Sequence, residues 1–574
     1  MNRLKIRIVA TIAGALCLTL IVACGPGAQQ TTSDTQGQTE RAAGGTTERS
    51  GAEVAKERGG KLIMSQSTGF GNPNDPHLTA TGNGRTYAIP VANWLLRRDV
   101  HDKKFPIIPD LAKSWELSND GLTYTFKLRE GVKFQNVAPV NGREFTSEDV
   151  KYNLMRITTA DSSIVVDKWK PRFQRALDFG TIKSIDTPDK YTLVVKLAEP
   201  YAPFIDAVAN PGTAMLPREF VEKFPEKIIT EGMVGTGPFM PVEYKNQQLA
   251  TYKKNPDYWN KDSAGGQLPY LDELHFLYFA DVQSEIAAFR SSQLDIPRGL
   301  KKSQVDTLKR ENPNFQVFVT PSATLAMFRF NMKFKPFQDV RVRRAIHLAV
   351  DRHQIVDLVT EGTGVVSGPV TPIYADMANT MDWLLSQPGY RKDKTQDIEE
   401  AKRLMKEAGY ADGLAFEVLS STNIDPSDLL AVFADQLKPL NITLKATIVD
   451  YAGQWVPRST QGEFELTHMT HALATDADSL LSPHLISDAP RNYGKFSDPT
   501  LDDMIKKERS ATTQEERKKW AQEAEKRALE IVPIAPLYTT TNTILVQPWV
   551  HNAGDGPVAG ASAYITERAW VSKH

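Results

Sequence analysis

Apolar and polar residues alternate with a period of two along several short segments of the chain. This is the pattern of a β-strand that buries one face and exposes the other. A first strand is expected at Lys61–Ser65. The alternating segments are Leu122–Leu128, Tyr191–Leu197, Leu274–Tyr278 and Ile442–Ile448.

A period of 3.6 residues marks helices between these strands. In Asp397–Ala408 the apolar residues Ala401, Leu404, Met405 and Ala408 fall on one face. Asp397 and Glu400 resemble a capping box at its start, and Gly409 is a typical C-terminal stop. The segment therefore predicts an amphipathic helix.

Three further helices follow the same pattern. Thr146–Ile157 would bury Val150, Leu154 and Ile157, and Thr513–Leu529 would bury Trp520, Ala521 and Ala524. Asp339 is expected to cap a helix with Val342, Ile346, Ala349 and Val350 inside and with Arg341 and Arg344 outside. Because helices and strands are interspersed, the fold class expected is α/β with mixed sheets.

The first residues carry an export pattern. Arg3, Lys5 and Arg7 precede the apolar run Ile8–Val22, which is short for a bilayer span. Ile21–Gly25 resembles the bacterial lipobox, in which a cysteine, here Cys24, receives a lipid and becomes the mature N-terminus. We expect a lipoprotein signal peptide over 1–24; a plain signal peptide or an uncleaved anchor are the alternatives. Residues 25–59 lack large apolar side chains and predict a disordered tether.

Length, charge and cysteine content limit the classes of function that the chain could have. The 574 residues are enough for three or four domain-sized masses. Lys and Arg number 68 against 69 Asp and Glu, so nucleic acid is not an expected partner. Cys17 and Cys24 are the only cysteines, which excludes a disulfide, a zinc cluster or a thiol nucleophile in the body.

The chain has no catalytic motif of a common kind. HExxH, GxSxG, the P-loop, paired CxxC and the EF-hand loop are all absent, and no cofactor or metal is expected. His468 and His471 are interpreted as pocket or core residues rather than metal ligands. Asp476 and Asp478 could bind an amine or cap a turn. The aromatic residues near Tyr451 and Trp455 fit core packing or ligand stacking.

Ten sequence blocks are spread along nearly the whole chain after the tether: Pro109–Glu116, Gly121–Phe134, Phe145–Val150, Val234–Phe239, Asn255–Trp259, Phe330–Asn331, Pro336–Ala345, Ala349–Arg352, Glu407–Tyr410 and Pro533–Tyr538. Most blocks can be interpreted as scaffold: Gly235 and Gly237, for example, suit a turn that needs positive φ. Together and in this order, the blocks resemble the family-5 extracytoplasmic solute-binding proteins of ABC importers, the dipeptide, oligopeptide and nickel type.

The resemblance implies a two-lobed periplasmic-binding-protein fold (type II, cluster C) with an extra domain in the first lobe. By that analogy lobe I is 60–100, 225–316 and 533–574, the extra domain is 101–224, and lobe II is 317–532. The lobes would be hinged at Phe315–Thr320 and Val532–Thr541, since short extended segments can absorb a closing rotation.

The function implied is solute capture by lobe closure, not catalysis. The solute would be peptide-like or another small polar molecule, and the partners would be an ABC permease and ATPase. A monomer, lipid-anchored on the outer face of the cytoplasmic membrane, is expected. A sensor or chaperone lipoprotein without its own transporter, or an exported hydrolase, are the alternatives.

The ligand site is expected between the lobes. One side would be the loop after the first strand, and the other would flank the element that binds ligand in the resembling family. Peptide-binding members anchor the ligand ammonium on an aspartate in a Trp-x-x-Asp element, whereas this chain has Leu473 or Ala474 at that place. We therefore expect weak binding of simple dipeptides, with Asp476 serving any cationic ligand. The expected residues are Ser67, Thr68, Gly69, Phe70, Tyr451, Trp455, Arg458, His468, His471 and Asp476.

Overall fold

The computed structural model describes most of the chain after residue 58. The expected signal peptide, Cys24, the tether to residue 58, the loop Ser67–Gly71, and Leu473 and Ala474 lie outside the described residues. The described residues are 59–66, 75–78, 87–99, 106–158, 176–225, 228, 232–371, 374, 376–422, 426–472, 476–489, 491–553 and 566–572.

A four-stranded sheet, here called the first sheet, begins with the expected N-terminal strand. The strand order is β1-β10-β9-β8, and β1 pairs with β10 in parallel. Leu274 and Phe276 are buried, as their alternation predicts. The bounds are β1 Lys61–Gln66, β8 Phe239–Lys245, β9 Leu249–Lys254 and β10 Glu273–Tyr278.

An antiparallel sheet, here called the meander sheet, lies within the range expected for the extra domain. Its strand order is β4-β5-β7-β6, and it shares one hydrophobic core with the first sheet, so Leu62 and Phe126 belong to the same cluster. The helix expected near Thr146 is α3. The bounds are β4 Ala112–Leu117, β5 Thr123–Leu128, β6 Ile182–Asp189, β7 Thr192–Leu197, α3 Ser147–Thr158, α4 Phe204–Val208 and α5 Arg218–Lys223, with the short pair β2 Leu96–Arg98 and β3 Ile107–Pro109.

A six-stranded mixed sheet, here called the large sheet, has the order β12-β16-β11-β15-β13-β14. Alternate residues enter cores on its two faces. Phe328 and Val418 belong to one cluster, and Met327 and Leu419 belong to the other. The bounds are β11 Gln316–Phe330, β12 Val365–Val366, β13 Leu414–Ser421, β14 Ile442–Val449, β15 Leu466–Ala472 and β16 Ile534–Val546.

Helices cover both faces of the large sheet. Ile346, Ala401 and Phe433 come from helices on the Phe328 side, and Leu481 and Ala524 from helices on the Met327 side. The bounds are α8 Lys335–Gln338, α9 Val340–Ala349, α10 Arg352–Val359, α11 Met381–Ser386, α12 Thr395–Glu407, α13 Ser427–Leu437, α14 Val456–Gln461, α15 Asp478–Leu485, α16 Pro499–Ser510 and α17 Gln514–Ile531. Elsewhere lie α6 Val282–Arg290, α7 Lys302–Glu311, β17 Val550–His551 and β18 Trp570–Val571.

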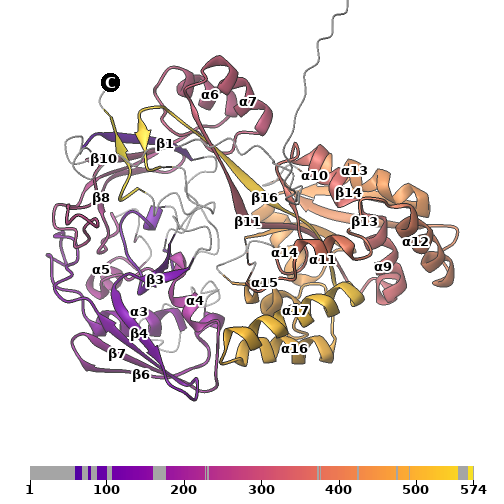
Figure 1. Cartoon of the computed structure of the whole chain (residues 1–574), viewed down its shortest axis with the longest axis horizontal. Coiled ribbons are helices and arrows are strands. Elements are labelled where there is room, and N and C mark those ends of the chain that lie inside the picture. The colour runs from indigo at the N-terminus through magenta and orange to yellow at the C-terminus, as the bar shows by residue number, and fades with distance from the viewer. Residues whose placement is uncertain are drawn as a thin grey trace, which may run out of the picture. The chain divides into compact units, whose positions relative to one another are not determined.

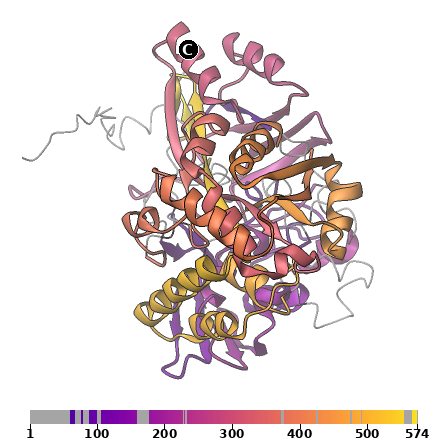
Figure 2. The ribbon, with the colours of Figure 1, turned by 90° about the vertical axis from the view of Figure 1, so that its right-hand side faces the viewer.

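The two expected hinge segments are parts of one antiparallel ribbon, β11 with β16, which run side by side (Figures 1 and 2). At one end Phe318 and Ile544 pack against the core of the first and meander sheets. At the other end Leu325 and Ile534 enter a core of the large sheet. The register is irregular between Pro321 and Leu325. The ribbon therefore joins two cores, with its least regular part between them.

Three local expectations are wrong. Helix α12 begins at Thr395, and Asp397 caps nothing at its start: its carboxylate accepts hydrogen bonds from Lys394 and Gly389. Trp520 is only half-buried, with the Lys507 ammonium 4.5 Å from its ring centre. The sequence pattern predicts that the aromatic ring at this position is part of the core. In the fold the ring lies on the partly exposed surface of the helix, beside a lysine side chain.

Gly235 and Gly237 do not have positive φ. They are required because the chain passes close to another backbone: a Cβ on Gly235 would lie 2.3 Å from the Val91 carbonyl oxygen, and one on Gly237 would lie 2.5 Å from the Val91 carbonyl carbon. The Gly237 amide donates to that carbonyl at 2.8 Å. Close approach, rather than turn geometry, explains this block.

Candidate functional site

A buried cluster of charged side chains surrounds Arg517 on α17. The guanidinium Nη2 lies 2.6 Å from Asp476 Oδ2, and Nε donates to Glu508 Oε1 at 2.8 Å. Only 7% of the Arg517 side chain is exposed. Asp476 also accepts a hydrogen bond from the Asp478 amide and so makes the turn that leads into α15. Asp476 therefore has a turn role and an internal cationic partner.

The cluster continues onto elements around the meander sheet. Arg517 Nη1 lies 3.5 Å from Asp206 Oδ2 on α4, and Asp206 also pairs with Arg98 on β2. Next to it, the Arg509 guanidinium lies 4.8 Å from the ring centre of Tyr201, and the Ala202 amide donates to the Arg509 carbonyl at 2.7 Å. Charged and backbone contacts thus tie α16 and α17 to the segment that contains α4.

Burial controls the protonation of this cluster. It raises the pKa of Asp478, although the Arg509 guanidinium opposes the rise. Burial likewise raises the pKa of Glu508, and the Asp478 carboxylate adds to the rise. Burial acts to lower the pKa of Arg517, but the Asp476 and Glu508 carboxylates hold it above its ordinary value. Arg517 therefore stays charged and is the central cation of the cluster.

Tyr451 and Trp455 lie in a π-helical turn after β14 and stack on each other, with ring centres 5.5 Å apart. Trp455 is 6% exposed and donates from Nε1 to Thr467 Oγ1 at 3.2 Å. Tyr451 is only half-buried. The pair packs on the Met327 side of the large sheet, so the tyrosine is its more accessible member.

The two predicted histidines lie on β15 and have different surroundings. His468 is buried, its ring centre is 5.6 Å from that of Phe328, and Nδ1 lies 3.0 Å from Ser420 Oγ. Burial lowers the pKa of His468 to about 4. His471 instead packs edge to face against His484 at 4.3 Å, and its Nε2 lies 3.3 Å from the Ser479 carbonyl oxygen. The structure does not bring the two imidazoles together.

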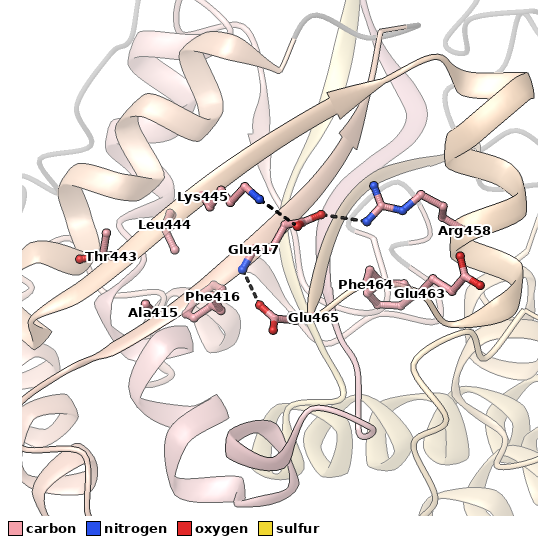
Figure 3. Close-up of a pocket in the computed structure, with 10 residues that line it drawn as sticks. All are labelled: Ala415, Phe416, Glu417, Thr443, Leu444, Lys445, Arg458, Glu463, Phe464 and Glu465. Atoms are coloured by element: carbon pink, nitrogen blue, oxygen red, sulfur yellow. Dashed lines mark hydrogen bonds and ion pairs between the residues drawn. The ribbon is translucent and has the colours of Figure 1, made fainter.

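Arg458, on α14, lies at a surface pocket of about 560 Å³ (Figure 3). It pairs with Glu417 Oε1 at 2.9 Å, and Lys445 approaches the other oxygen of Glu417. The pocket is lined by Ala415, Phe416, Glu417, Thr443, Leu444, Lys445, Arg458, Glu463, Phe464 and Glu465. All of these come from β13, β14, α14 and the turn before β15, so the pocket is not bounded by two bodies.

The predicted site residues thus fall in separate places, and their role in ligand binding stays a prediction. Arg517 was not predicted as a site residue, because a charged residue on an amphipathic helix is usually solvated. Asp206 was missed too, since no local pattern links it to α17.

Within the described part of the chain, no group of three or more His, Cys, Asp or Glu residues could hold a metal ion. Across the same residues, the helices are too short or too polar to span a membrane.

Comparison with known proteins decides the family. The model of bacterial extracellular solute-binding proteins, family 5 Middle, matches residues 106–490. The chain belongs to this family. The resemblance seen in the sequence blocks is thereby confirmed, and with it the two-lobed α/β fold of the family-5 proteins.

The family relatives bind different solutes. The di/tripeptide-binding protein 1 of Pseudomonas aeruginosa is 27% identical over 474 residues, covering 80% of this chain and 85% of its own length. The Helicobacter pylori protein DppA, solved with the peptide STSA, covers 91% of this chain and 100% of its own with a TM-score of 0.76 at 22% identity. AgaA from A. tumefaciens R10, solved with agropinic acid, covers 90% and 99% with a TM-score of 0.73 at 25% identity.

Proposed function

We propose that this family-5 protein captures a peptide-like or other small polar solute between two lobes and delivers it to an ABC permease and its ATPase. The β11–β16 ribbon is the observation that carries this proposal. It joins two separate cores, and its irregular register between Pro321 and Leu325 lies between them. Two bodies joined by two extended strands can rotate about them, and a solute that contacts both bodies favours the closed form.

We propose that the solute is not held by a free ammonium group bound to Asp476. In the described structure that carboxylate is bound by Arg517, so an ammonium would have to displace a buried guanidinium. By the resemblance to the family, Leu473 or Ala474 would stand where the peptide-binding members have their aspartate. We therefore propose weak binding of simple dipeptides and better binding of solutes whose amine is blocked or absent.

We further propose that Cys24 is lipidated and holds the protein at the outer face of the cytoplasmic membrane. The basic start, the apolar run and the lipobox-like Ile21–Gly25 support this.

Native mass spectrometry of the full chain, purified in mild detergent, tests the proposed function. We expect a retained solute that is released on unfolding. A thermal-shift panel of dialanine, tetraalanine, N-acetyltetraalanine and glutathione then defines the class, and the acetylated peptide should raise the melting temperature more than dialanine. A chain that retains nothing and responds to no panel member contradicts the proposal.

A further inference from the structure

Four side chains on the β11–β16 ribbon have a buried nitrogen or oxygen atom without a hydrogen-bond partner among the described residues: Thr320, Arg329, Thr541 and Asn542. Two of them form a cross-strand pair. Thr320 on β11 lies directly opposite Asn542 on β16. Cross-strand partners point to the same face of a sheet, so these two side chains are neighbours. Thr320 Oγ1 and Asn542 Nδ2 are both buried, and neither has a partner among the described residues. Thr320 as a whole is only 7% exposed.

The pair lies where the ribbon passes from one core to the other. Phe318 and Ile544, two residues further along each strand, share its face and pack against the core of the first and meander sheets. On the other side the register becomes irregular after Pro321, and Leu325 already belongs to a core of the large sheet. Thr320 and Asn542 therefore lie between the two cores. They are on the face of the ribbon that packs against the core of the first and meander sheets.

The two unpaired groups define which kind of solute atom could bind them. A buried polar group without a partner costs about 1–3 kcal/mol, so a group that supplies the partner is favoured by a similar amount. The Asn542 amide nitrogen can only donate, and the Thr320 hydroxyl can donate as well. Neither residue carries a charge. An acceptor oxygen of the solute therefore matches both groups.

We propose that Thr320 and Asn542 form a neutral subsite that donates hydrogen bonds to a carbonyl or hydroxyl oxygen of the captured solute. The subsite rests on the proposed function and adds to it, because it makes the ribbon a recognition element as well as a hinge. It also fits a solute that is not held through a cationic end, since both donors recognise an oxygen.

Two isosteric substitutions in the full chain, Thr320→Val and Asn542→Leu, test the subsite. Thr543→Val is the matched control: it makes the same chemical change one residue along β16, on the opposite face, where its cross-strand partner Val319 is 60% exposed. Affinity for N-acetyltetraalanine, or for the solute that co-purifies if the peptide does not bind, is measured by titration calorimetry. Melting of each ligand-free variant is measured in parallel.

We expect Thr320→Val and Asn542→Leu each to weaken solute binding about tenfold, while Thr543→Val binds like the parent. The ligand-free Thr320→Val chain should melt no lower than the parent, because the lost hydroxyl has no partner to lose. Parent-like affinity in both variants, or an ordered water that bridges both side chains in the solute complex, overturns the subsite alone. A parent chain that binds neither the peptide nor any co-purifying solute overturns the proposed function, and the subsite with it.

Discussion

Arg517 and Asp476 form a short ion pair in the interior of the charged cluster, with Nη2 2.6 Å from Oδ2. The same guanidinium reaches Glu508 on α16 and Asp206 on α4. One side chain therefore neutralises carboxylates from three different parts of the chain. Its removal leaves the buried Asp476 and Glu508 carboxylates without this guanidinium, whereas Asp206 keeps its pairing with Arg98.

Replacing Arg517 by Gln should strongly destabilise the protein. Breaking a buried ion pair from one side typically costs about 3–5 kcal/mol in the free energy of unfolding, measured here by urea denaturation. The control is Arg527→Gln on the same helix, where the side chain is 30% exposed and pairs with Asp498. That change should cost about 1 kcal/mol or less. Equal losses in the two variants would show that Arg517 is no more than a surface charge.

Acid should destabilise the protein partly through His468. The pKa of this imidazole is lowered to about 4 by burial, whereas the unfolded residue titrates near 6.5. Between these values the unfolded chain binds a proton that the folded chain does not. The contribution of His468 to the free energy of unfolding is therefore fully present above pH 6.5. It is lost as the pH drops toward 4, by up to about 3 kcal/mol.

The His468→Gln variant removes that titration. Its free energy of unfolding should fall less steeply between pH 6.5 and pH 4.5 than that of the parent. If the His468→Gln slope equals the parent's, the buried imidazole is not a source of acid sensitivity.

A methyl group at Gly235 should destabilise the fold by steric conflict. The added Cβ would lie 2.3 Å from the Val91 carbonyl oxygen, and backbone cannot move away as a flexible side chain can. We expect Gly235→Ala to lose about 3 kcal/mol or more on thermal or urea unfolding. Gly131→Ala is the comparison, because Gly131 has positive φ but open space around it. Its loss should be roughly 1–2 kcal/mol, and the reverse order would refute the close-approach explanation.

The sequence predicted local structure well because local structure is recorded in neighbouring residues. Leu274 and Phe276 alternate in the sequence and are buried in β10, and Asp339 caps α9 as expected. No local sequence pattern indicates the pairing of Arg517 with Asp206, because either residue alone resembles a solvated surface charge. Only the folded chain brings α17 and α4 together.

The candidate site shows the same limit. His468 and Trp455 were predicted as site residues because they flank the element that binds ligand in the resembling family, and the structure buries them on different faces of the large sheet. Thr320 and Asn542 carry no local signal at all, since a threonine and an asparagine in extended segments are common. Their significance depends on cross-strand register, which a single sequence does not contain.

Replacing Cys24 by Ser should abolish lipid attachment. The lipobox-like segment provides one cysteine for the lipid, and serine cannot form the thioether. Cells grown with labelled palmitate should give a labelled parent and an unlabelled Cys24→Ser chain. Cys17→Ser is the matched control and should remain labelled. Label that persists in the Cys24→Ser chain would contradict the anchor.

Solute-driven closure about the ribbon can be measured directly as a distance. No cysteine follows Cys24, so labelling sites can be introduced at Val242 on β8 and Leu358 on α10, which are 62% and 59% exposed. Pulsed electron spin resonance of the doubly spin-labelled chain would give the distance distribution with the retained solute and after its removal. We expect a shorter and narrower distribution with solute bound. An identical distribution in the two states, with binding shown on the same sample, would contradict solute-driven closure.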